Sequence, residues 1–161
     1  MVGVCAVTMI LLDRSTACAR MLAPACVFTA RSVEQVLNSM GMDCRRDAAT
    51  LTHPGGFGYE IGFACTGTIP AALLAAAILV AGGRCRTRFW GATLGALSVL
   101  LVNLVRLLSL FYVGVFAPRF FTALHTFVWQ ALTVVFVTGF FYTWKRKSAL
   151  RLTARINGAS H

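Results

Sequence analysis

A cysteine, an arginine and a histidine that could together transfer an acyl group lie well apart in this chain, at Cys65, Arg106 and His125. In such chemistry the thiol attacks a peptide carbonyl, the imidazole carries the proton, and the guanidinium stabilises the oxyanion or the thiolate. Each residue alone also has an ordinary interpretation, because single cysteines are usually inert and single histidines are usually structural. The set becomes catalytic only if three separate elements bring it together.

Arg106 is the residue that most needs a function. It lies in the apolar run "LLVNLVRLLSLFYVGVF" (100–116), where an arginine costs roughly 2.5–3.5 kcal/mol on membrane insertion. Asn103 precedes it by about one helical turn on the same face and is a candidate supporting residue that orients the guanidinium. The alternative is that Asn103 and Arg106 are polar packing groups between helices.

The composition indicates that a bilayer, rather than a large internal core, covers most of the apolar surface. The 161 residues are 58% hydrophobic and 12% charged, and the mean hydropathy is +0.74. A soluble domain carries about twice that fraction of charge. We therefore expect one membrane domain over 1–161, with an N-terminal hydrophobic and amphipathic segment (1–50), a core (51–144) and a basic cytoplasmic tail (145–161).

The predicted fold is an all-α integral membrane protein, a small polytopic helix bundle with three clear transmembrane helices. The spans are expected at 68–82, 90–116 and 122–144; the first nearly crosses the bilayer, and a few residues before Thr68 could complete it. An uncertain N-terminal hydrophobic segment and an amphipathic helix are expected before them.

The net charge of +10 is explained by basic clusters at the ends of the apolar runs. The clusters "RCRTR" (84–88) and "KRK" (145–147) should face the cytoplasm, which places Cys65 and His125 towards the opposite side. These clusters suit anionic lipid head groups, so the lipid bilayer is the expected partner and nucleic acid is not.

The N-terminal region leaves three interpretations open. Residues 1–12 are apolar but too short to span, so they form a partial insertion, a longer span reaching about Ala30, or a first helix clipped by the start of the chain. Residues 24–40 have helical apolar spacing, with Pro24 suited to the first turn and Gly41 to the stop.

The stretch "LTHPGGFGYEIGFACTG" (51–67) combines turn residues with alternation and predicts a short strand or extended approach to Cys65. Thr66 or Thr68 is expected to cap the following helix, with Pro70 in its first turn. The positive end of that helix would favour a thiolate at Cys65. The six cysteines show neither CxxC pairs nor Cys/His metal spacing, so no metal or organic cofactor is implied.

Three runs that contain these residues resemble the signature blocks of the exosortase/archaeosortase family. They are "GFGYEIGFACTG", "NLVRLLSLFYVG" and "LHTFVWQAL", and the resemblance covers about residues 51–144. The residues around Asn103 and His125, and the short length of the chain, are most similar to the small exosortase H type. The family's catalytic Cys, Arg and His fall on Cys65, Arg106 and His125.

The resemblance implies a cysteine-type peptidase or transpeptidase in the bacterial inner membrane, with its active site facing the periplasm. Its partners would be secreted proteins carrying a C-terminal sorting signal of short motif, hydrophobic helix and basic tail. Tyr59, Glu60, Phe120 and Phe121 could line the entrance or belong to an interfacial belt. Two alternatives stay open: a thiol protease with water as acceptor, and a non-enzymatic membrane assembly or channel subunit in which Asn103 and Arg106 are packing groups.

Overall fold

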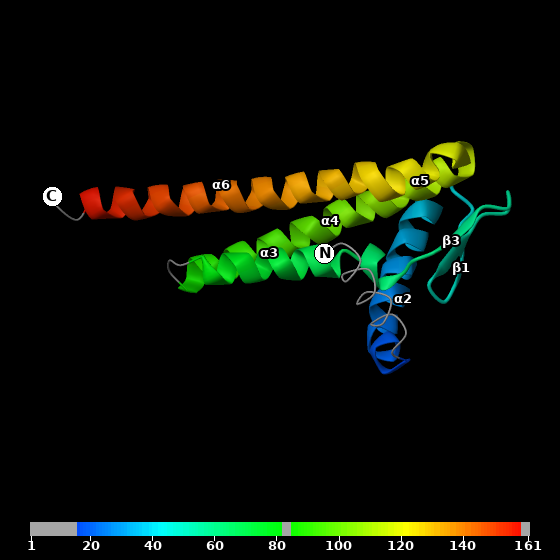
Figure 1. The fold of residues 1–161 in the computed structure, drawn as a ribbon, viewed down its shortest axis with the longest axis horizontal. Coiled ribbons are helices and arrows are strands. Elements are labelled where there is room, and N and C mark those ends of the chain that lie inside the picture. The colour runs from blue at the N-terminus through cyan, green and yellow to red at the C-terminus, as the bar shows by residue number, and fades with distance from the viewer. Residues whose placement is uncertain (1–15, 82–84, 159–161) are drawn as a thin grey trace, which may run out of the picture. The chain divides into compact units, whose positions relative to one another are not determined.

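The computed structural model describes residues 16–81 and 85–158, so the apolar segment 1–12 lies outside the described residues. The chain divides into two compact units, Met1–Thr66 and Gly67–His161. The described part is mostly helical, and the second unit consists of long helices lying side by side (Figure 1).

The first unit packs one helix against a small sheet. Helix α2 (Thr16–Ser39) buries one stripe at helical spacing and packs against the first two strands of the sheet and residues 63–65, and Leu51 and Ile61 of this unit are also buried. The stripe consists of Cys26, Ala30, Val33 and Leu37. The amphipathic helix was therefore predicted correctly in type but begins earlier, so Pro24 lies inside it and not in its first turn. The residues around Pro24 include several alanines, which favour helix.

The predicted stop of this helix at Gly41 is confirmed. Gly41 adopts a left-handed conformation (φ +82°), its N–H donates to the Asn38 carbonyl at 3.1 Å, and the Met42 N–H donates to the Leu37 carbonyl at 3.0 Å. This pair of bonds is a Schellman motif, which satisfies carbonyls that the helix end would leave unpaired.

The sheet corrects the prediction of an entirely helical protein. Strands β1 (Arg45–Asp47), β2 (Thr50–Thr52) and β3 (Gly58–Glu60) pair antiparallel in the order β1-β2-β3. The turn residues after Thr52 and the alternation that follows them predicted a short strand near β3. The charged "RRD" of β1 has no alternation of apolar and polar residues, so β1 was not predicted. An Arg46–Glu34 ion pair at 3.0 Å joins this sheet to α2.

In the second unit, α3 (Thr68–Val80), α4 (Cys85–Phe116) and α6 (Trp129–Gly158) form the bundle. A turn η2 (Pro118–Phe120), a short α5 (Phe121–Ala123) and a π-helical η3 (Leu124–Val128) join α4 to α6. Two helical stretches are long and apolar enough to cross a membrane, Cys85–Phe116 and Pro118–Ser148.

The third predicted span is not confirmed. Helix α3 has 13 residues, or about 20 Å, against a hydrocarbon core of about 30 Å. The residues before Thr68 do not lengthen it, because η1 (Phe63–Cys65) is a 3-10 turn and Gly67 is left-handed (φ +74°).

Small residues of α4 allow its neighbours to approach closely. A Cβ added to Gly95 would lie 3.0–3.3 Å from Phe140, Leu74 and Ile78, and Gly91 lies directly against the Trp144 indole. Leu74, Ile78 and Val99 are buried in the resulting core. At the other end of α3, Arg88 Nη1 donates to the Leu79 carbonyl at 2.8 Å and so pairs a terminal carbonyl of that helix.

Candidate active site

Arg106 and His125 meet in the second unit, although 19 positions separate them in the chain. Arg106 Nη2 donates to the backbone carbonyl of His125 at 3.4 Å, a long hydrogen bond. The Arg106 side chain is half-buried, and its Nε is a buried donor without a hydrogen-bond partner in the described part of the chain. The guanidinium is thus held at one end and retains a donor that could serve a developing anion.

The backbone around His125 is π-helical. In η3 the Trp129 N–H donates to the Leu124 carbonyl, whereas an α-helical turn would direct it to the His125 carbonyl. Single π turns in helices are rare and occur frequently at functional sites. The altered register changes the hydrogen bonding at the carbonyl that Arg106 contacts.

Phe121 holds the His125 ring from the preceding turn. The two rings stack with centroids 5.8 Å apart and an interplanar angle of 8°. From the sequence, Phe121 was expected at the entrance or in an interfacial belt. Its spacing of four residues from His125 is the signal that could have identified the stack, because such residues share a helix face.

Asn103 lies one turn before Arg106 and is buried, with 7% of its surface exposed. It packs against the turn that opens α3, where a Cβ added to Gly67 would lie 2.8 Å from both Cβ and Cγ of Asn103. Two features therefore require a glycine at position 67: the left-handed backbone and the close approach of Asn103. The glycine was not recognised as a site residue from the sequence.

Cys65 belongs to the first unit, where it ends the η1 turn and is half-buried. Its N–H donates to the Gly62 carbonyl at 2.9 Å. Burial raises the pKa of the Cys26 thiol, and Cys65 and Glu60 add to this effect by their charge, so both lie within electrostatic range of Cys26.

The predicted threonine cap is wrong. Gly67, and not a threonine, is the N-cap residue of α3, and the Thr66 hydroxyl donates to the Phe63 carbonyl at 2.7 Å. Pro70 does lie in the first turn of α3. Thr66 alone separates Cys65 from Gly67, so the candidate nucleophile directly precedes the turn that packs on Asn103.

The described residues contain no group of three or more His, Cys, Asp and Glu side chains that could hold a metal ion. No known protein family, characterised protein or solved structure was found to match the chain. The contact between Arg106 and His125 is therefore the structural basis for assigning a function.

Proposed function

We propose that the protein is a membrane cysteine peptidase or transpeptidase of the exosortase type. It cleaves C-terminal sorting signals of secreted proteins at the outer face of the bacterial inner membrane, with Cys65, Arg106 and His125 as catalytic residues. The observation that carries the proposal is the pairing of Arg106 with His125, because these are the two residues that the family resemblance pairs with a cysteine nucleophile.

The chemistry follows from the three groups. The Cys65 thiolate attacks the carbonyl carbon of the sorting motif, and Arg106 stabilises the oxyanion that forms. The His125 imidazolium donates a proton to the leaving amine as the peptide C–N bond breaks, leaving a thioester on Cys65. An acceptor amine or water gives a proton to His125 and attacks the thioester, which releases the product and restores the thiolate.

The depth of the site supports this proposal. If Gly91 and Trp144 mark one boundary of the hydrocarbon core, Asn103 lies about 18 Å and Arg106 about 22 Å along α4 from it. The turn at Gly67 packs on Asn103 and so lies about 12 Å inside the far boundary of a 30 Å core. Irregular backbone at that depth occurs where it is buried in protein or lines an aqueous cavity. Gly67 is buried, so protein shields this turn from lipid, as a site at this depth requires.

The non-enzymatic alternative has an observation in its favour. Arg106 bonds to the backbone carbonyl of His125, and Asn103 is buried beside Gly67, as expected of polar groups that hold helices together. In that case neither the thiol of Cys65 nor the imidazole of His125 is needed for function.

Processing of a co-expressed secreted substrate tests the proposal. The substrate carries a short motif, a hydrophobic helix and a basic tail at its C-terminus, and the products are followed by mass. Cys65→Ala, Arg106→Ala and His125→Ala should each abolish tail removal while still reaching the membrane. Cys85→Ala and Arg119→Ala, which remove an exposed thiol and an exposed cation, should process normally.

Product masses separate transfer from hydrolysis, since transfer leaves a modified new C-terminus and hydrolysis a free carboxylate. Equal processing by all variants, against candidate substrates from the same genome, would contradict the enzymatic proposal and favour the packing role of Asn103 and Arg106.

A further inference from the structure

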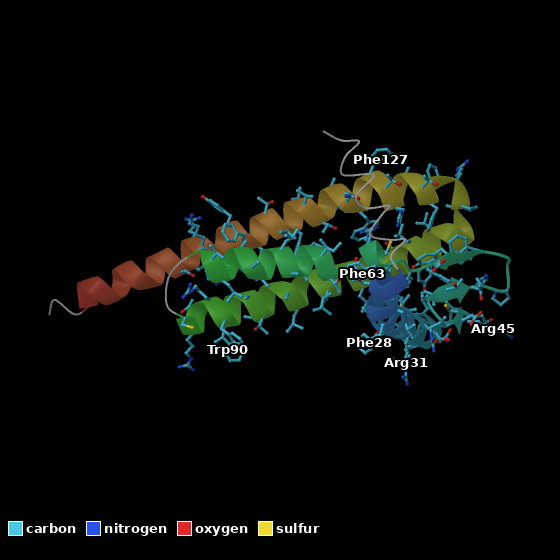
Figure 2. The ribbon with its side chains drawn as sticks, turned by 60° about the horizontal axis from the view of Figure 1, so that its bottom comes forward. Phe28, Arg31, Arg45, Phe63, Trp90 and Phe127 are labelled. Atoms are coloured by element: carbon cyan, nitrogen blue, oxygen red, sulfur yellow. The ribbon has the colours of Figure 1, made fainter. Side chains whose placement is uncertain are left out.

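A groove of about 460 Å³ lies at the other end of the bundle from Arg106 and His125. It is formed by the first turns of α4 and by residues 140–148 of α6, so it lies at the ends of both candidate spans. Figure 2 shows Trp90 near the start of α4 and Phe127 on η3, towards the opposite end of the bundle. The side chains used in the argument are Arg86, Trp90, Leu94, Trp144, Lys147 and Ser148.

The charge of the groove points to an anionic ligand. All five acidic residues of the chain precede Gly67, so no Asp or Glu of the second unit can neutralise Arg86 or Lys147. The Ser148 hydroxyl, which also lines the groove, is a further donor for phosphate oxygens.

The apolar wall of the groove distinguishes a lipid from a small soluble anion. Trp90 and Leu94 are 58% and 54% exposed, and they continue the lining from the cationic end along α4. Tryptophan is enriched at membrane boundaries, and basic pockets between helices at that level bind phosphate head groups. Such a site offers cations to the head group and an apolar surface to the first carbons of the acyl chains.

We infer that this groove binds the phosphate of an anionic glycerophospholipid. Arg86 and Lys147 contact the phosphate, and Trp90 and Leu94 contact the glycerol and upper acyl chain. The inference rests on the membrane location proposed above, but not on the proposed catalysis, and it uses none of the proposed catalytic residues.

Tryptophan fluorescence tests the inference without any enzyme assay. The chain has three tryptophans, so Trp129→Phe leaves only the two that line the groove, Trp90 and Trp144. This variant is reconstituted in phosphatidylcholine vesicles, and insertion is verified by flotation and resistance to alkaline extraction. Quenching by added brominated phosphatidylglycerol is compared with quenching by brominated phosphatidylcholine, and we expect the anionic lipid to quench at a much lower fraction.

A matched pair of charge variants locates the binding. Arg86→Gln with Lys147→Gln should weaken selective quenching roughly 100-fold, since each lost contact to the charged phosphate contributes a factor of about ten. Lys145→Gln with Arg146→Gln removes the same charge from exposed neighbours outside the groove and should weaken selective quenching clearly less, because only the diffuse attraction to the anionic surface is lost.

Three results would overturn the inference: equal quenching by the two brominated lipids, equal weakening in the two double variants, or failure of the chain to insert. The second result would indicate a diffuse attraction of the basic cluster to the membrane surface. None of these outcomes depends on substrate processing, so loss of the lipid site and loss of the proposed enzyme activity are distinguishable.

Discussion

Replacing Gly67 by alanine should destabilise the second unit strongly, because two penalties apply at this position. The left-handed backbone (φ +74°) costs an ordinary residue about 1–2 kcal/mol. The new Cβ would also lie 2.8 Å from Cβ and Cγ of Asn103, and such overpacking costs about 1–3 kcal/mol. The sum of about 2–5 kcal/mol corresponds to a fall in Tm of about 4–20 °C for a chain of this size.

Two comparisons separate the penalties. Gly56 is also left-handed (φ +88°) but has no atom within 4 Å of an added Cβ, so Gly56→Ala should show the backbone penalty alone. Because Gly56 belongs to the first unit, the decisive comparison uses Asn103→Gly, which removes the Cβ and Cγ that crowd position 67. In that background Gly67→Ala should lose only about 1–2 kcal/mol.

The assay is thermal unfolding of the purified protein in detergent, followed by far-ultraviolet circular dichroism, for the four members of the cycle. A coupling of about 1–3 kcal/mol between positions 67 and 103 is expected. Additive effects, or a wild-type Tm for Gly67→Ala, would refute the close approach of Gly67 to Asn103 and with it the depth assigned to the turn after Cys65.

Three other predictions concern single side chains. Arg106→Lys should reduce substrate processing roughly 10- to 100-fold although charge is kept, because the planar guanidinium supplies several donors at once; near-normal processing would indicate a purely electrostatic role. Phe121→Ala should reduce processing about two- to tenfold by releasing the His125 ring, whereas Phe120→Ala should have little effect; equal effects of the two would contradict the stack. Burial, followed by the charge of Glu34, raises the pKa of the Cys44 thiol from 9.0 to about 11, so the folded state holds this proton more tightly. Its contribution to stability is therefore present below pH 9 and is lost as pH rises towards 11, and the urea midpoint should fall more steeply over that range than in Cys44→Ala; parallel curves would argue against the shift.

The apolar helices were the most predictable part of the fold. The end of α4 at Phe116 follows from Pro118, which cannot continue the helix, and the structure ends α4 at that residue. Helix α6 continues to Gly158, beyond the expected limit of residue 144, because hydropathy detects only the apolar part while Lys, Arg, Ala and Leu continue to favour helix. The sheet was only partly foreseen, since three-residue strands are too short for alternation to identify.

The candidate site was likewise predictable from the sequence only in part. The basic clusters predicted only the side of the membrane on which His125 lies, and the structure adds that the Arg106 guanidinium contacts the His125 backbone. The π turn at Leu124–Val128 could not be predicted, because a one-residue change in helical register leaves no mark on apolar periodicity. The contact of Gly67 with Asn103 depends on packing between helices that only the folded chain defines.

The shortness of α3 connects these observations. Helix α3 begins directly after Gly67, and Gly67 packs against Asn103. Helix α3 therefore packs along α4 only as far as Asn103, one turn before Arg106. The guanidinium therefore lies where α4 has lost one helical neighbour and where the η3 backbone departs from α-helical bonding. A complete third span would pack an apolar helix alongside this level of α4. The shortness of α3 thus leaves Arg106 at a level of α4 that α3 does not reach, beside the π-helical backbone of η3 whose carbonyl it contacts.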